Sequence, residues 1–125
     1  RNKKMKFICS EQYLRVGNQK LSEKIEKKVI NMPIAHADGN YYASSDELKR
    51  LSDQDRIILK YSDKYGNIDR LYNPNGSSEN IAGIMNENCN VFGAMPHPER
   101  ACDEMNSGCD GKMFFQALFE LYGRI

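Results

Sequence analysis

The chain has 125 residues, of which 40% are hydrophobic and 28% charged, and its formal net charge is +1. These values suit one modest globular domain and give no electrostatic case for nucleic-acid binding. No stretch approaches the roughly 20 consecutive apolar residues of a membrane span, and no signal peptide opens the chain. We therefore expect a single domain over residues 1–125, cytoplasmic, that binds neither nucleic acid nor a membrane.

Short strands and helices alternate in the first half of the chain. Apolar spacing predicts a strand over 6–16, a short helix over 21–29 and a strand over 29–35. Pro33 lacks a backbone donor, which places the second strand at an edge or at a bulge. Ser44 and Glu47 have the spacing of a capping box, so we expect a helix of one or two turns directly after Ser44.

The second half is richer in strands. The residue pattern predicts strands over 56–62, 68–72, 81–85 and 91–95 and a helix over 114–122. The first two of these strands would form a hairpin, and turn-forming residues over 73–78 predict a loop. The sequence predicts several short strands but only one clear helix. A self-contained doubly wound sheet needs more helices, so this pattern fits a piece of a larger domain.

The most informative feature is a histidine and a glutamate that stand between prolines directly after an apolar strand. Pro96 and Pro98 push the residue before each of them out of the helical region, so we expect an extended segment. In an extended chain residues i and i+2 point the same way, so Glu99 would reach one imidazole nitrogen of His97. Such a pair supplies the base and the orienting group of a nucleophile–base–orienter relay. A surface loop in which the two groups only satisfy each other is the alternative.

A relay also needs a nucleophile, and the cysteines of this chain are poor candidates. None has the Gly-x-Cys-x-Gly shape of a strained strand-to-helix turn, so we expect the nucleophile to lie outside the chain. A metal site could combine His97 and Glu99 with cysteines, but the spacing lacks a Cys-x-x-Cys pair, and we expect no metal. We also expect reduced thiols rather than a disulfide scaffold. The cysteines are Cys9, Cys89, Cys102 and Cys109.

The second histidine, His36, also lies where a strand ends and a glycine-containing loop begins. A hydrogen-bonded structural histidine is one interpretation of this position. A residue that binds substrate is the other, because functional side chains are often placed at strand ends.

Four sequence blocks together resemble a known family. They are Pro33-Ile34-Ala35-His36, Asn73-Pro74-Asn75-Gly76-Ser77, Asn80-Ile81-Ala82-Gly83-Ile84, and the run from Asn90 to Ala101 that contains Pro96-His97-Pro98-Glu99. In order and spacing they resemble the glutaminase subunits of phosphoribosylformylglycinamidine synthase, which are class I glutamine amidotransferases of purine biosynthesis. The resemblance implies the C-terminal part of a flavodoxin-like α/β amidotransferase domain, strand-rich and with one clear C-terminal helix.

The resemblance also implies a function. In a Cys-His-Glu triad, His97 would be the base and Glu99 would orient it, while the cysteine attacks the side-chain amide of glutamine. His36 would belong to the substrate-binding loop. Ammonia would pass to a synthetase subunit, assisted by a small accessory subunit, which uses ATP and magnesium to convert formylglycinamide ribonucleotide to the amidine. This chain would hold no cofactor of its own.

Three departures from the family pattern qualify this expectation. The Gly-x-Cys-x-Gly-x-Gln elbow lies upstream in the family and is absent here, so the chain alone is expected to be inactive. Ala37 stands where the family usually has glycine, which leaves the role of the His36 loop open. Cys89 also replaces a common glycine, and a positive φ there would cost roughly 1 kcal/mol. The alternatives are a non-catalytic docking module and an amidotransferase or γ-glutamyl hydrolase of another pathway.

Overall fold

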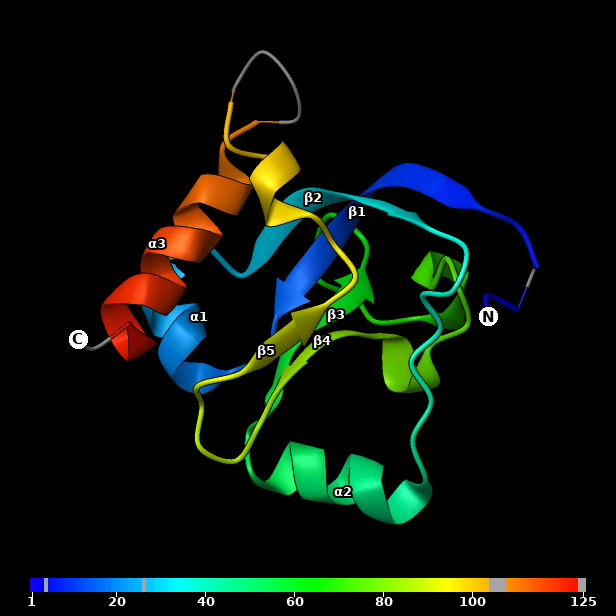
Figure 1. Ribbon diagram of the computed structural model, residues 1–125, viewed down its shortest axis with the longest axis horizontal. Helices are drawn as coiled ribbons and strands as arrows, with labels where there is room; N and C mark the ends of the chain where they lie inside the picture. Colours follow the sequence, from blue (N-terminus) through cyan, green and yellow to red (C-terminus); the bar gives the residue numbers. More distant parts are fainter. Residues whose placement is uncertain (4, 26, 104–107, 124–125) are drawn as a thin grey trace.

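The computed structural model describes residues 1–3, 5–25, 27–103 and 108–123, and its centre is an antiparallel sheet (Figure 1). The five strands lie in the order β2-β1-β3-β4-β5. The strands are β1 (Ile8–Val16), β2 (Val29–His36), β3 (Ile57–Ser62), β4 (Ile81–Met85) and β5 (Phe92–Ala94). The described helices are α1 (Gln19–Ile25), α2 (Ser45–Asp53) and α3 (Asp110–Tyr122), with the short 3-10 helices η1 (Arg70–Tyr72), η2 (Ser78–Asn80) and η3 (Pro98–Arg100).

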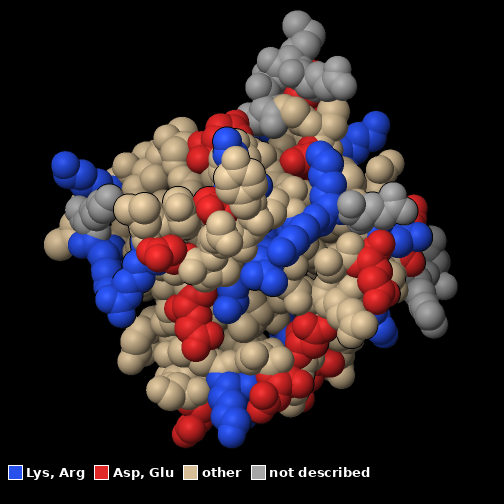
Figure 2. All heavy atoms as spheres, turned by 180° about the vertical axis from the view of Figure 1, so that it is seen from behind, with Lys and Arg blue, Asp and Glu red and all other residues tan. Residues whose placement is uncertain are grey.

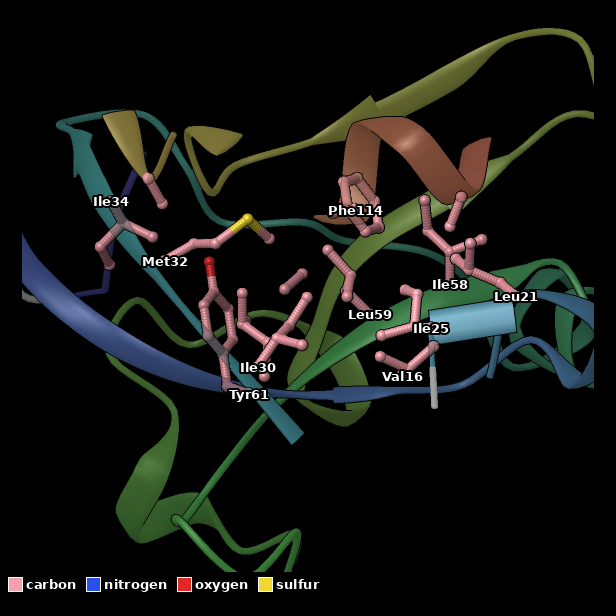
Figure 3. Packing of buried hydrophobic residues seen from close by; sticks show 14 of the residues in the cluster. Val16, Leu21, Ile25, Ile30, Met32, Ile34, Ile58, Leu59, Tyr61 and Phe114 are labelled. Atoms are coloured by element: carbon pink, nitrogen blue, oxygen red, sulfur yellow. The ribbon is translucent and has the colours of Figure 1, made fainter. Parts of the chain in front are cut away.

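The main core lies between the sheet and the pair of helices α1 and α3, which pack against each other (Figure 1). Leu14 of β1 pairs with Ile30 of β2 on one side and with Tyr61 of β3 on the other, and all three are fully buried. Figure 3 shows Phe114 of α3 packed among the buried residues of the strands. A smaller cluster under α2 is formed by Leu51, Ile57 and Ile81.

The last residues of strand β1 alternate between a buried and an exposed face. Leu14 and Val16 are buried, whereas Tyr13 and Arg15, which alternate with them, are exposed. On the side of the molecule seen in Figure 2, Lys and Arg side chains lie among Asp and Glu side chains, so this surface carries both signs of charge. No helix within the described residues is long and apolar enough to cross a membrane.

The two edges of the sheet meet at one point. The chain that leaves β5 reaches the free edge of β2, where Pro96 forms a single antiparallel bridge with Ile34. The backbone N–H of His97 then donates to the carbonyl of Pro33 at 2.8 Å. Pro33 therefore lies in an edge strand, as its missing donor predicts, and the edge is closed by the segment that carries the histidine.

Most of the elements predicted from the sequence are present. The capping box is formed, since the Ser44 side chain accepts from the Glu47 backbone and the Glu47 side chain accepts from the Ser44 backbone. The helix over 21–29 is shorter than predicted, because α1 ends at Ile25 and Val29 already begins β2. The hairpin β4–β5 and the C-terminal helix are also confirmed.

The strand predicted over 68–72 is wrong, because this segment contains η1. The carboxylate of Asp69 accepts the backbone N–H of Leu71 at 2.9 Å and starts the 3-10 turn. Before it, the carboxylate of Asp63 accepts the N–H groups of Tyr65 and Asn67. These local side-chain bonds give the backbone an alternative to a sheet ladder, so the hairpin does not form.

Candidate active site

His97 and Glu99 lie in direct contact. Nδ1 of His97 is 2.7 Å from Oε1 of Glu99, as their spacing predicts. The backbone differs from the extended segment expected from the sequence, because His97 leads directly into η3 and Pro98 occupies the first position of that turn. The carboxylate thus reaches the imidazole across a tight 3-10 turn, to which the fixed φ of proline is suited.

The contact determines which imidazole nitrogen carries a proton. An ionised carboxylate only accepts, so Nδ1 of His97 donates to Glu99 and Nε2 is the acceptor of the neutral ring. Partial burial raises the pKa of the Glu99 carboxyl. The hydrogen bond from His97, the backbone N–H of Glu99 and the charges of His97 and Arg100 outweigh this and hold that pKa below its ordinary value. In this tautomer Nε2 is the nitrogen that can act as a general base.

Backbone hydrogen bonds hold the segment that carries His97 in place, independently of its side chains. The N–H of Met95 donates to the carbonyl of Ala82 at 3.0 Å, which extends the β4–β5 pairing. Two residues later the N–H of His97 donates to Pro33 of β2. The N–H of Arg100 closes η3 on the carbonyl of His97 at 3.1 Å. The histidine segment is therefore held between β4 on one side and the edge strand β2 on the other.

The first turn of α3 packs against η3, and this contact requires a glycine. Gly111 lies so close to Pro98 that an added Cβ would stand 1.9 Å from the Pro98 carbonyl oxygen. The N–H groups of Gly111 and Lys112 donate to the carbonyl of Ala101 at 2.8 and 3.2 Å. The start of α3 therefore supports the turn that carries Glu99.

Asp110 ties the same end of α3 to the edge strand. Its Oδ2 accepts the backbone N–H of Asn31 at 2.8 Å, and its Oδ1 lies 3.0 Å from Nζ of Lys27. A carboxylate at the start of a helix is also favoured by the helix dipole. Strand β2, η3 and α3 are thus joined to one another in pairs around the candidate site.

His36 lies at the end of β2 within a network of side-chain amides. Its Nδ1 is 3.2 Å from Nδ2 of Asn2, and its Nε2 is 3.3 Å from Nδ2 of Asn75. Each amide nitrogen also donates to a backbone carbonyl, that of His36 for Asn2 and that of Gly39 for Asn75. Both ring nitrogens therefore face amide N–H donors, whereas a neutral imidazole accepts at only one of them.

The surroundings of His36 favour the neutral form of its ring and lower its pKa. Burial is the main cause that lowers the pKa of His36, the backbone hydrogen bond of the residue raises it, and the positive charge of His97 lowers it further. The two histidines lie in the same region of the molecule, because His97 is bonded to Pro33 in the strand that ends at His36. Gly39 packs against the ring, since an added Cβ there would lie 2.3 Å from ring atoms. These contacts suit a structural histidine, and substrate binding by His36 stays a prediction.

A hollow of about 220 Å³ opens beside this region. It lies between the loop that follows His36 and the β4–β5 hairpin that leads to His97. Its lining is largely apolar and comes from residues 38–41, 81–84 and 93–95. Neither histidine lines it, so the hollow alone does not define a substrate site.

No cysteine thiol is hydrogen-bonded to the side chain of His97 or Glu99 in the described part of the chain. All four are free, and among the described residues no hydrogen bond joins a thiol to His97. Within the same ranges no three or more His, Cys, Asp and Glu side chains are grouped to hold a metal ion. Cys89 has a φ of 56°, the positive value at which replacing a glycine costs backbone strain. The nucleophile of the relay stays a prediction.

Several supporting residues have no role in the sequence interpretation. Asn75 lies in one of the blocks that carry the family resemblance, and Gly111 lies just before the predicted C-terminal helix. Nothing in the sequence says which groups these two residues touch. Asn2 lies in no recognised motif, although its side chain contacts His36. Tyr61 looks like an ordinary core residue, yet its hydroxyl lies 3.2 Å from Asn75, and burial raises its pKa to about 12.

Comparison with known proteins identifies related sequences. Residues 1–116 match the family described as CobB/CobQ-like glutamine amidotransferase domain. The chain is 45% identical over 120 residues to subunit PurQ of phosphoribosylformylglycinamidine synthase from Pelagibacter ubique (strain HTCC1062). It is 43% identical over 120 residues to the subunit of the same name from Aquifex aeolicus (strain VF5). Both alignments cover 94% of this chain and 53% of the relative.

A solved structure, PurLQS from Thermotoga maritima, matches with a TM-score of 0.74 and 37% sequence identity. The match covers 96% of this chain and 50% of the matched chain. The chain therefore spans about half the length of the relatives that it resembles. The expected fold class, the strand-rich part of a class I glutamine amidotransferase fold with a C-terminal helix, is confirmed.

We expect Gly111→Ala to lower the free energy of unfolding by about 1–3 kcal/mol, because its Cβ would overlap the backbone carbonyl of Pro98. Urea denaturation measures this change. Gly93→Ala in β5 is the matched control, since an added Cβ there meets nothing within 4 Å. Equal stability of the two variants would contradict the close contact between α3 and η3.

The lowered pKa of His36 predicts a pH-dependent stability. Below the ordinary value of 6.5 the unfolded chain binds more protons at this residue, so the stabilisation is complete above that pH and is lost as the pH falls through the lower pKa of the folded state. The variant His36→Gln should lack this component. Urea denaturation at about pH 7.5 and about pH 5.5 should show a larger loss for the wild type. The same loss in both proteins would refute the assignment to His36.

Proposed function

Because the chain belongs to the family of CobB/CobQ-like glutamine amidotransferase domains, we propose that it supplies the histidine and the carboxylate of the glutaminase component of phosphoribosylformylglycinamidine synthase. The observation that carries the proposal is the 2.7 Å contact between His97 and Glu99, in a segment held by backbone bonds to β4 and β2. The PurQ relatives, at 42–45% identity, support the assignment to purine biosynthesis. The activity is that of a protein about twice as long as this chain.

In the proposed reaction a cysteine outside this chain attacks the side-chain amide of glutamine. Nε2 of His97 takes the thiol proton and then gives it to the departing ammonia, which leaves a glutamyl thioester. Backbone N–H groups near the cysteine stabilise the oxyanion of the intermediate. Water then hydrolyses the thioester, with His97 again as the base. Glu99 keeps the ring oriented and offsets the positive charge of the imidazolium. By this mechanism the 125-residue chain alone does not hydrolyse glutamine.

The ammonia is used by other subunits in this proposal. The solved relative is named PurLQS, which supports assembly of this kind of chain with further subunits. We assign to this chain a synthetase partner and a small accessory subunit. ATP and magnesium belong to the synthetase, which amidates formylglycinamide ribonucleotide, and this chain holds no cofactor.

Activity measurements separate the proposal from the two alternatives that the sequence leaves open. A non-catalytic docking module would share every residue of this chain, so glutamine hydrolysis by the complete wild-type protein excludes it. An amidotransferase of another pathway would hydrolyse glutamine but would not respond to the purine synthetase. Stimulation of hydrolysis by that synthetase therefore identifies the pathway.

His97→Ala should abolish glutamine use but spare the use of ammonia. In the complete protein assembled with its synthetase, we expect glutamine-dependent synthesis to fall by roughly 10³- to 10⁶-fold, because the base is lost. Synthesis from added ammonium salt should be unchanged, since it bypasses the triad. Lys49→Ala, on the exposed surface of α2, is the control and should keep both activities. Retained glutamine hydrolysis in a folded His97→Ala protein would refute the role of His97.

Glu99→Gln should have a smaller effect. The amide oxygen can still accept from Nδ1 of His97, but the negative charge that supports the imidazolium is lost. We expect kcat for glutamine hydrolysis to fall by up to roughly 10⁴-fold, less than for His97→Ala, with little change in KM. Steady-state kinetics of the complete protein measures both constants. A loss as large as that of His97→Ala would contradict a role limited to orientation and charge.

A further inference from the structure

Two of the cysteines lie opposite each other where the chain passes from η3 to α3. Asp103 and Gly108 form an isolated antiparallel bridge, and Gly108 has a φ of +84°. In an antiparallel pair the residues that flank a bridge also stand opposite each other, so this register pairs Cys102 with Cys109. Both cysteines are free and exposed.

Contacts at one carbonyl group bring the same two segments together. The thiol of Cys102 donates to the carbonyl oxygen of Pro98 at 3.2 Å. Gly111 also lies close to that oxygen, and Cys109 is the N-cap residue of α3, two positions before Gly111. The carbonyl of Pro98 therefore lies next to both the sulfur of Cys102 and the first turn of α3.

The register of this bridge predicts a separation of the two cysteines that suits a disulfide. Opposed residues of an antiparallel pair have Cα atoms about 4.5–5.5 Å apart, within the range of about 4.4–6.8 Å seen in disulfides. Cys102 only has to turn its sulfur from the Pro98 carbonyl toward Cys109, a rotamer change that an exposed side chain makes readily. Cys9 in β1 and Cys89 in the β4–β5 turn have no such opposed cysteine in the registers of the described strands.

We propose that Cys102 and Cys109 form a reversible disulfide when the protein meets an oxidising small disulfide such as oxidised glutathione. The thiolate of one cysteine attacks a sulfur of the small disulfide, which releases one thiol and leaves a mixed disulfide. The second cysteine thiolate then displaces the remaining half. In sum, two cysteine thiols lose two protons and two electrons and form one S–S bond, and the small disulfide is reduced to two thiols.

The disulfide would strengthen the contact between η3 and α3, which supports His97 and Glu99. Without it, η3 and α3 are joined by the backbone bonds at Ala101 and by the packing of Gly111 on Pro98. A covalent link between Cys102 and Cys109 adds a second connection at the same place and restricts the unfolded chain. The oxidised protein should therefore melt at a higher temperature than the reduced one.

A tryptic digest tests the pairing directly. Trypsin cuts after Arg100 and Lys112, so Cys102 and Cys109 fall in one peptide, 101–112, that contains no other cysteine. After the folded chain is incubated with oxidised glutathione, this peptide should weigh less by two hydrogen atoms, and dithiothreitol should reverse the change. A further cut after Glu104 should leave its two pieces joined. A peptide that keeps both thiols, or that carries glutathione on each cysteine, would overturn the proposal.

Matched variants and an unfolded control complete the test. Cys102→Ser and Cys109→Ser should each abolish both the mass change and the rise in melting temperature. The double variant Cys9→Ser/Cys89→Ser should keep both. In concentrated urea the ratio of internal to mixed disulfide should fall by about tenfold, because the fold no longer holds the thiols opposite each other. An equal ratio in folded and unfolded protein would overturn the role of the register.

Discussion

The hydrogen bond from the backbone of His97 to the carbonyl of Pro33 joins the two edges of the sheet, and the candidate site depends on it. The chain from β5 reaches β2 where Pro96 stands opposite Ile34. Neither Pro33 nor Pro96 has a backbone N–H, so the pairing cannot extend into a regular ladder. The chain is anchored at this point and then turns into η3. The prolines thus have a double effect, because they stop the strand and direct the turn that brings Glu99 to the imidazole.

The hydrophobic core reaches the site through α3. Phe114 packs among the buried residues of the sheet, which sets the position of the helix (Figure 3). One turn earlier, Gly111 touches the carbonyl of Pro98, and Asp110 binds the backbone of Asn31. The packing of α3 on the core therefore fixes the position of η3, through contacts that mostly involve backbone atoms. Such contacts tolerate little change of position, which is what a histidine–carboxylate pair needs.

The elements predicted correctly from the sequence are those that local chemistry determines. The capping box at Ser44 and the edge position of Pro33 each follow from groups within a few residues. The contact between His97 and Glu99 was also predictable, but its 3-10 turn was not, because the proline rules describe only the residue before each proline. The amides of Asn2 and Asn75 around His36 come from distant parts of the chain. No local pattern encodes contacts of that kind, and only the folded sheet brings them together.

The two histidines show how the surroundings divide chemical roles between identical side chains. Nδ1 of His97 faces a carboxylate, so a proton gained at Nε2 produces an imidazolium whose charge has a partner 2.7 Å away. Both nitrogens of His36 face amide N–H groups, of Asn2 and Asn75. If both nitrogens carried a proton, each N–H of the ring would point at another N–H, which is unfavourable. A positive His97 disfavours a second proton on this ring further, since its charge lowers the pKa of His36. The two histidines thus differ in their hydrogen-bond partners, which are a carboxylate for His97 and two amides for His36.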